Sequence, residues 1–295
     1  MPPAGMADID RAPTRVGIGM NRPAKDWVQV GPYRLALHVH PPRGELRGAV
    51  IMGHAMMSHA GVLRSLARTL TLLGCSVWRL DFRGHGSSDG SARFQDWSFD
   101  HLVREDWPAA VDRVRSCLPG VPLLALGHSL GGLVALASQG TGRCHVDAIG
   151  VMGSGLWHTR DVGLAFGALR LAASNATLPL VRWAHRLPAR RMGIGIDEPV
   201  TFWRQLVGWG RDGRWTGLDG TDYLVAASKV GVPVHGWRGA RDPFVRMADH
   251  QRLLEAAGGS WTVVPGAGHL DLPHRATAEV GDWIDCVLDG QRRCR

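Results

Sequence analysis

The feature that most constrains the fold is a glycine-framed serine that stands between two apolar segments. Residues 127–132 read Gly-His-Ser-Leu-Gly-Gly; they follow the apolar run 121–126 and precede an amphipathic helical pattern. A strand, a sharp turn and a helix in this order are typical of the G-x-S-x-G turn, which lifts a serine hydroxyl above the edge of a parallel sheet. Gly127 and Gly131 have no Cβ, so the strand and the helix can approach closely. The pattern predicts a strained Ser129 within reach of a histidine.

Strand-like and helix-like segments alternate on both sides of this turn. The strand candidates are residues 27–30, 33–40, 48–53, 75–81, 146–151, 232–237 and 260–264, with helical patterns between most of them. Such alternation indicates an α/β fold in which helices cover both faces of a mostly parallel sheet. The first two runs, which flank a Gly-Pro pair, predict an opening hairpin.

The alternation stops in one long segment that is rich in tryptophan and arginine. We expect residues 157–227 to form an inserted helical cap, with helical pieces near 162–173, 178–186 and 200–208. The core is then built from residues 26–156 and 228–295, and residues 1–25 form a disordered lead-in.

The composition is that of an ordinary globular protein. Apolar residues make up 45% and charged residues 20% of the chain. No apolar run reaches the roughly 20 residues that a transmembrane helix needs. The first residues lack the apolar centre of a signal peptide, which favours a cytoplasmic location. The 5 cysteines are odd in number and widely spaced, so we expect free thiols rather than a disulfide framework or a zinc site.

The net charge of +8 comes almost entirely from arginine, because Lys25 and Lys229 are the lysines of this chain. A surface for nucleic acid or for anionic membranes is one interpretation. The other is an arginine-biased composition spread over a solvated surface. No tight basic run occurs, so we expect no nucleic-acid partner, although a basic field favours anionic substrates.

Two further residues are placed to assist Ser129. A serine hydroxyl needs a base, and the base needs an orienting carboxylate. In parallel sheets such groups lie just past the carboxyl ends of strands. Asp242 follows the strand candidate 232–237, and His269 follows 260–264. We predict Asp242 as the orienting acid and His269 as the base; the less well placed competing acids are Asp222, Asp249 and Asp271.

Two backbone N–H groups are predicted to form an oxyanion hole. Leu130, directly after the serine, supplies one, and Met56 in the loop after strand 48–53 supplies the other. His54 is expected to shape this loop, and His128 to pack beside the serine. We do not expect either ring to act as the base.

Two other chemistries fit the sequence less well. A metal cluster of His54, His128 and His269 lacks an acidic partner. The glycine-rich loop 83–90 matches neither G-x-G-x-x-G nor a P-loop, which argues against phosphate binding. Asp81, Arg83 and Asp89 instead indicate a salt-linked loop that supports the oxyanion strand.

Taken together, these pieces resemble the α/β-hydrolase family in its serine aminopeptidase, monoacylglycerol-lipase-like or lysophospholipase-like branch. The matching segments, in family order, are residues 53–56, 81–88, 127–132, 239–242 and 266–269. The resemblance implies a mostly parallel eight-stranded sheet, helices on both faces and an inserted helical cap. Members usually carry His-Gly in the oxyanion loop. This chain has His54-Ala55-Met56, which resembles a little-characterised bacterial subgroup.

We therefore expect a serine hydrolase that cleaves small-molecule carboxylic esters through an acyl-enzyme, without a metal or an organic cofactor. The candidate substrate-pocket residues are Trp157, Trp203 and Met57, although the cap tryptophans fit packing between helices equally well. Open alternatives are an acyltransferase, an amidase or peptidase, a carbon–carbon hydrolase with the same triad, and a non-catalytic ligand-binding protein. The sequence leaves acyl chain length and oligomeric state open.

Overall fold

A mixed sheet forms the centre of the protein, in a computed structural model that describes residues 23–156 and 164–290. Within these residues the sheet has eight strands, in the order β1-β2-β4-β3-β5-β6-β9-β10. The hairpin of β1 (Ala24–Val30) and β2 (Tyr33–His40) is antiparallel, and β2 pairs antiparallel with β4. The parallel strands are β3 (Gly48–Gly53), β4 (Cys75–Leu80), β5 (Leu123–His128), β6 (Ala148–Met152), β9 (Val234–Gly239) and β10 (Ser260–Val264).

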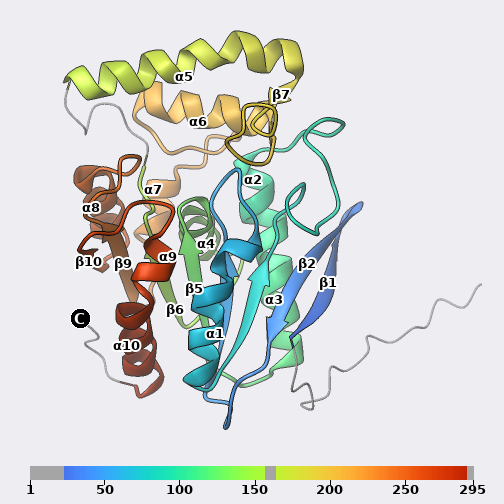
Figure 1. Cartoon of the computed structure of the whole chain (residues 1–295), viewed down its shortest axis with the longest axis vertical. Helices are drawn as coiled ribbons and strands as arrows, with labels where there is room; N and C mark the ends of the chain where they lie inside the picture. The colour runs from blue at the N-terminus through green and yellow to red at the C-terminus, as the bar shows by residue number, and fades with distance from the viewer. Residues whose placement is uncertain (1–22, 157–163, 291–295) are drawn as a thin grey trace, which may run out of the picture.

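Helices cover both faces of this sheet (Figure 1). Strands β3 to β6 and β9 are buried along their whole length, which explains why apolar residues predominate in β3, β5 and β6. Val50 and Met52 pack on one face in a cluster with residues of α1 and α10, while Ala49 and Ile51 pack on the other with residues of α3, α4 and α8. The expected α/β architecture is confirmed. The helices of the core are η1 (Ala60–Leu63), α1 (Arg64–Leu72), α2 (Phe99–His101), η2 (Leu102–Asp106), α3 (Trp107–Cys117), α4 (Leu130–Gly140), α8 (Met247–Ala256), α9 (Leu272–Arg275) and α10 (Thr277–Leu288). The elements α2, η2 and α3 follow one another without a break.

Above the carboxyl ends of the strands lies a second group of elements (Figure 1). It comprises α5 (Leu164–Ala184), a two-stranded ribbon of β7 (Arg186–Leu187) and β8 (Glu198–Pro199), and α6 (Val200–Asp212). From here on, "cap" denotes residues 164–212. The chain returns to the core through α7 (Tyr223–Ala227).

The cap differs from the sequence prediction in two ways. The helical pieces expected near 162–173 and 178–186 are one helix, α5. In its polar middle, Asn175 Nδ2 donates to Leu171 O (2.8 Å) and Thr177 Oγ1 donates to Ser174 O (2.6 Å), so both side chains bond to carbonyl groups of the helix itself. The ribbon was not predicted at all, since two-residue strands are too short to show a period. The helix expected at 200–208 is present as α6 and continues to Asp212.

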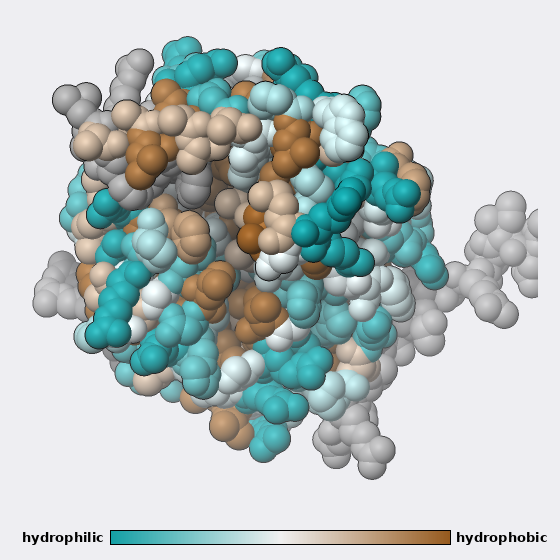
Figure 2. All heavy atoms as spheres, turned by 45° about the horizontal axis from the view of Figure 1, so that its top comes forward, coloured by the Kyte–Doolittle hydropathy of each residue, from teal (hydrophilic) through white to brown (hydrophobic). Residues whose placement is uncertain are grey.

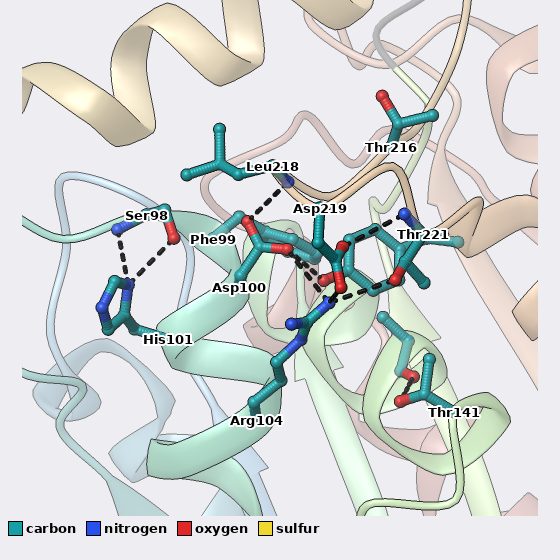
Figure 3. Close-up of polar contacts among 12 residues, drawn as sticks. Ser98, Phe99, Asp100, His101, Arg104, Thr141, Thr216, Leu218, Asp219 and Thr221 are labelled. Carbon is teal, nitrogen blue, oxygen red and sulfur yellow. Dashed lines mark hydrogen bonds and ion pairs between the residues drawn. The ribbon is translucent and has the colours of Figure 1, made fainter.

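Buried and half-buried carboxylates fasten the cap and the segment after it to the core. Asp100 in α2 accepts hydrogen bonds from Gln205 Nε2 (2.8 Å) and Tyr223 Oη (2.6 Å). Arg104, one turn later, pairs with Asp219 at 2.6 Å. Figure 3 shows Asp100 and Arg104 pointing from their helix toward the segment that holds Asp219. The base of the cap is therefore fixed on the helix that begins at Phe99.

Ion pairs hold the glycine-rich loop after β4, as expected. Arg83 is buried, and its Nε donates to Asp106 Oδ1 at 2.8 Å. Asp89 accepts from Arg34 N at 3.0 Å. Asp81 accepts from the N–H of Ala60 at 2.6 Å, which joins the end of β4 to the segment that follows β3.

The cysteines follow the prediction only in part. Cys75, Cys117 and Cys144 are free thiols, but Cys286 is disulfide-bonded. Wide and irregular cysteine spacing indicates the absence of a framework of several bridges, but it does not reveal one isolated bridge. Among the described helices, none combines the length and the apolar character that a membrane span requires.

Candidate active site

Ser129 occupies the turn between β5 and α4 in a strained backbone conformation. Its φ of 51° and ψ of −108° are rare for a residue with a side chain. Ser129 N donates to Met152 O at 2.8 Å, and Ser154 Oγ donates to Ser129 O at 2.8 Å. Both backbone groups of the serine are therefore fixed by β6 and the residues that follow it.

The neighbouring glycines permit this turn. A Cβ on Gly127 would lie 2.1 Å from Gly132 N, and a Cβ on Gly131 would lie 2.3 Å from Gly53 O. Both obstacles are backbone atoms, which cannot rotate away. Strand β5, helix α4 and strand β3 thus meet at a distance that only glycine allows.

Asp242 and His269 are bonded to each other above the ends of β9 and β10. Asp242 Oδ2 lies 2.7 Å from His269 Nδ1, and both residues are buried. The other oxygen, Oδ1, accepts from the N–H groups of Phe244 (2.8 Å) and Val245 (2.9 Å). Burial raises the pKa of Asp242, but its bonds to the imidazole and to these N–H groups outweigh burial and hold the pKa below its usual range. A charged Asp242 therefore keeps a proton on His269 Nδ1 and leaves Nε2 to face other groups.

The competing acids have other partners. Asp222 caps α7 by accepting from the N–H of Leu224 at 2.9 Å. Asp271 accepts from Gly268 N at 2.7 Å and also pairs with Arg275. Asp242 is the carboxylate whose contact with His269 the structure records.

Ser129 and His269 open into the same cavity, which has a volume of about 640 Å³. Its floor comes from the core and its roof from the cap, and most of its lining is apolar. Figure 2 shows a hollow in this face of the molecule with apolar side chains around it. The apolar lining residues include Ala55, Val62, Leu133, Ile194, Phe202, Leu206, Trp209, Phe244, Val245 and Leu270. A second cavity of about 630 Å³ lies between the end of α4 and the segment 219–229, is lined in part by Arg104, Arg143 and Lys229, and shares no lining residue with the first.

The two predicted oxyanion residues, Leu130 and Met56, both line the cavity that holds Ser129. Leu130 is the first residue of α4. Backbone N–H groups in the first turn have no acceptor within the helix, and the helix dipole makes this end positive. Met56 lies in the loop of residues 54–59 after β3, here called the β3 loop. Its neighbour Met57 has a left-handed φ of 55°.

His54 ties the β3 loop to the core. Its Nδ1 donates to Ala55 O at 2.7 Å, and its Nε2 accepts from Phe82 N at 3.2 Å. Burial, helped by the charge on His85, lowers the pKa of His54 to about 3. The ring is neutral, and its two hydrogen bonds join Ala55 of the loop to Phe82 after β4.

His128 performs a similar task beside the serine. Its Nε2 donates to the backbone oxygen of His269 at 2.9 Å. Burial is the main reason that its pKa falls to about 3, and the nearby His269 adds to the effect. His128 thus holds the His269 loop in place. Across residues 23–156 and 164–290, no three His, Cys, Asp or Glu side chains are grouped so that they could hold a metal ion.

The predicted pocket residues divide into different roles. Met57 lines the cavity. Trp203 does not: its Nε1 donates to Thr177 Oγ1 at 2.7 Å, so it joins α6 to α5. Trp157 lies outside the described residues. Trp209, one turn and a half after Trp203 on α6, lines the cavity instead.

One buried residue beside the site escaped the sequence analysis. Glu198 in β8 is 1% exposed, and its Oε1 accepts from Met57 N at 2.6 Å. The same oxygen lies 3.2 Å from His85 Nε2. Only its position, the second of two adjacent carboxylates before a proline in the irregular part of the cap, could have drawn attention to it.

A comparison of the sequence with models of known families identifies the family. The sequence model described as serine aminopeptidase, S33, matches residues 44–272. The chain belongs to this family. The resemblance inferred from the motifs is confirmed, and with it the α/β-hydrolase fold.

Curated proteins similar to this chain include lipases. The chain is 32% identical to monoacylglycerol lipase of Mycolicibacterium smegmatis over 120 residues, and this stretch covers 41% of this chain and 42% of that protein. It is 28% identical over 138 residues to human monoglyceride lipase, covering 47% and 45%. The chain therefore matches less than half the length of these relatives.

Solved structures share the fold over almost the whole chain. A soluble variant of monoglyceride lipase from Saccharomyces cerevisiae superposes with a TM-score of 0.70 at 16% identity, over 93% of this chain and 98% of that one. Est1E from Butyrivibrio proteoclasticus with bound ferulic acid gives a TM-score of 0.62 at 17% identity, over 88% and 97%.

Proposed function

We propose that the protein is a serine hydrolase that cleaves carboxylic esters with an apolar acyl group. The observation that carries the proposal is the shared cavity: Ser129 at its strained turn and His269, bonded to Asp242, line one apolar space of about 640 Å³. A nucleophile, a base and an orienting carboxylate in this order are the components of acyl transfer through serine.

In this mechanism, Ser129 Oγ attacks the ester carbonyl carbon while His269 Nε2 takes the hydroxyl proton. Asp242 stabilises the imidazolium and keeps Nδ1 protonated. The tetrahedral oxyanion accepts hydrogen bonds from the N–H groups of Leu130 and Met56, each worth about 3–4 kcal/mol in the transition state. His269 then protonates the departing alkoxide, which leaves an acyl-enzyme. Water, deprotonated by the same imidazole, releases the carboxylic acid.

The cavity supports an apolar acyl group as the part of the substrate that is bound. Phe202, Leu206 and Trp209 of α6 face Leu133 of the core across it. Burying a methylene group against such a lining favours binding by about 0.8 kcal/mol. A charged chain would lose its hydration there without finding a polar partner. The relatives named monoacylglycerol and monoglyceride lipase favour a single-chain acyl ester, and we propose this substrate class.

The test compares Ser129→Ala with the wild-type protein in two assays. We expect the substitution to lower turnover of p-nitrophenyl esters by at least about 10³-fold and to abolish labelling by a fluorophosphonate probe. Ser138→Ala is the matched control, because Ser138 is a serine of α4 that is fully buried and does not line the cavity. Labelling that persists in Ser129→Ala would contradict the proposal.

A further inference from the structure

One buried carboxylate of the cap contacts the β3 loop beside the candidate active site. Glu198 stands in β8, outside the serine, histidine and aspartate described above, and is 1% exposed. Its Oε1 accepts a hydrogen bond of 2.6 Å from Met57 N, in the β3 loop. A charged carboxylate loses several kcal/mol of hydration free energy when it is buried, so its partners in the protein must compensate for that loss.

Cap residues next to Glu198 contact the other backbone group of Met57, its carbonyl oxygen. Ile196 N donates to Met57 O at 2.9 Å. Gly195 approaches so closely that a Cβ there would lie 2.2 Å from the same oxygen. A left-handed backbone costs a residue such as Met57 about 1 kcal/mol or more, and these contacts offset that cost. The segment 195–198 thus forms hydrogen bonds with both backbone polar groups of Met57, the N–H and the carbonyl.

The same oxygen also anchors Glu198 to the core. Its Oε1 lies 3.2 Å from His85 Nε2, while His85 Nδ1 lies 2.9 Å from Arg83 O. A carbonyl and a carboxylate both accept, so the ring carries a proton on each nitrogen. Burial lowers the pKa of His85, but the charge and hydrogen bond of Glu198 outweigh it, and the net pKa lies above its usual range. Asp81 also raises the pKa of His85, and the charge on His85 in turn lowers the pKa of His54.

We propose that Glu198 is a positioning residue of the oxyanion hole. It fixes the Met57 peptide, and through that peptide it aims the N–H of Met56, one residue earlier, into the cavity. The inference rests on the proposed serine-hydrolase function and deepens it: the hole is complete only when segment 195–198 of the cap is seated on the β3 loop. A displacement of about 1 Å in such a donor is enough to slow a reaction about 100-fold.

Three substitutions separate the hydrogen bond from the charge. Glu198→Ala removes the acceptor of Met57 N, and we expect kcat for a p-nitrophenyl ester to fall about 100-fold while KM changes less than about 3-fold. Glu198→Gln keeps an oxygen for Met57 N without the charge, and we expect kcat within about 5-fold of wild type. Glu198→Asp keeps the charge but withdraws the oxygen by one methylene, so its kcat falls as in the alanine variant.

Asp100→Ala is the matched control. Asp100 is another buried carboxylate that joins core and cap, through Gln205; it also accepts from Tyr223 of α7 and is drawn in Figure 3. It has no place in the oxyanion hole. We expect a lower thermal midpoint for this variant, with kcat within about 3-fold of wild type, because removing a buried acceptor destabilises the fold without moving Met56.

The outcomes distinguish the two levels of the proposal. A folded Glu198→Ala that keeps the wild-type kcat overturns the positioning role, and so does an equal loss of kcat in Asp100→Ala. If Glu198→Ala does not fold, the other two variants decide: activity kept by Asp and lost by Gln overturns the role. A wild-type protein that neither hydrolyses esters nor reacts with a fluorophosphonate overturns the serine-hydrolase function itself.

Discussion

At the scale of single residues, Asp242 shows how a side chain can be fixed from two directions. One oxygen accepts from the backbone of the turn that follows β9, and the other meets His269 Nδ1. The two backbone hydrogen bonds fix the orientation of the carboxylate independently of the imidazole. The consequence is that an amide at this position would have little freedom to turn over.

This geometry predicts a large effect of Asp242→Asn. The amide oxygen stays with the N–H groups of Phe244 and Val245, so the NH₂ group faces His269. The imidazole must then accept at Nδ1 and carry its proton on Nε2, which can no longer take a proton from Ser129. We expect kcat to fall about 10⁴-fold with little change in thermal stability, measured by ester hydrolysis and by thermal unfolding.

Asp271→Asn is the control for that substitution. Asp271 lies two residues after His269 and accepts from Gly268 N, but its carboxylate is paired with Arg275. We expect it to retain activity within about 10-fold of wild type. An Asp242→Asn variant as active as Asp271→Asn would remove Asp242 from the mechanism.

At the scale of secondary-structure elements, the crossing of β3, β5 and α4 depends on backbone contact. Gly131→Ala would push a Cβ against Gly53 O, at 2.3 Å in the present structure. We expect a loss of more than about 3 kcal/mol in the free energy of unfolding, since neither the strand nor the helix can move alone. Denaturant unfolding measures this loss.

Gly208→Ala tests whether the effect belongs to the crossing rather than to glycine itself. Gly208 is also in a helix, α6, but nothing lies within 4 Å of the Cβ position. Alanine there should stabilise the protein by about 0.5–1 kcal/mol, because it restricts the unfolded chain and favours the helix. Equal destabilisation by the two substitutions would be inconsistent with the crowding described above.

Elements with a strong local signal were predictable, and those defined by tertiary contacts were not. Buried strands such as Gly48–Gly53 read as continuous apolar runs, and Ser260–Val264 was predicted to the residue. The predicted triad residues come together because the carboxyl ends of parallel strands share one edge. Glu198 could not be found in this way. Its role depends on a loop 141 residues away in sequence, and no local pattern encodes that contact.

At the scale of the whole molecule, buried histidines link stability to pH. Burial is the largest cause that lowers the pKa of five of them, to about 3 for His54 and His128 and to about 4 for His40, His235 and His250. In the unfolded chain each would titrate near 6.5. Above that pH both states are neutral at these sites, so they add no pH dependence. Below pH 6.5 these histidines bind protons in the unfolded chain but stay neutral in the folded protein.

The folded state should therefore lose stability as the pH falls from about 6.5 toward 4, before most carboxylates titrate. Thermal unfolding midpoints measured at half-unit steps would show the decline. His250→Gln keeps a donor for Ser154 O, to which the ring nitrogen now bonds at 2.7 Å, but no longer titrates, so it should make the decline shallower. His145→Gln, at a side chain 73% exposed, should leave the slope unchanged. A midpoint that stays constant across this range would refute the view that these buried rings remain neutral in the folded protein.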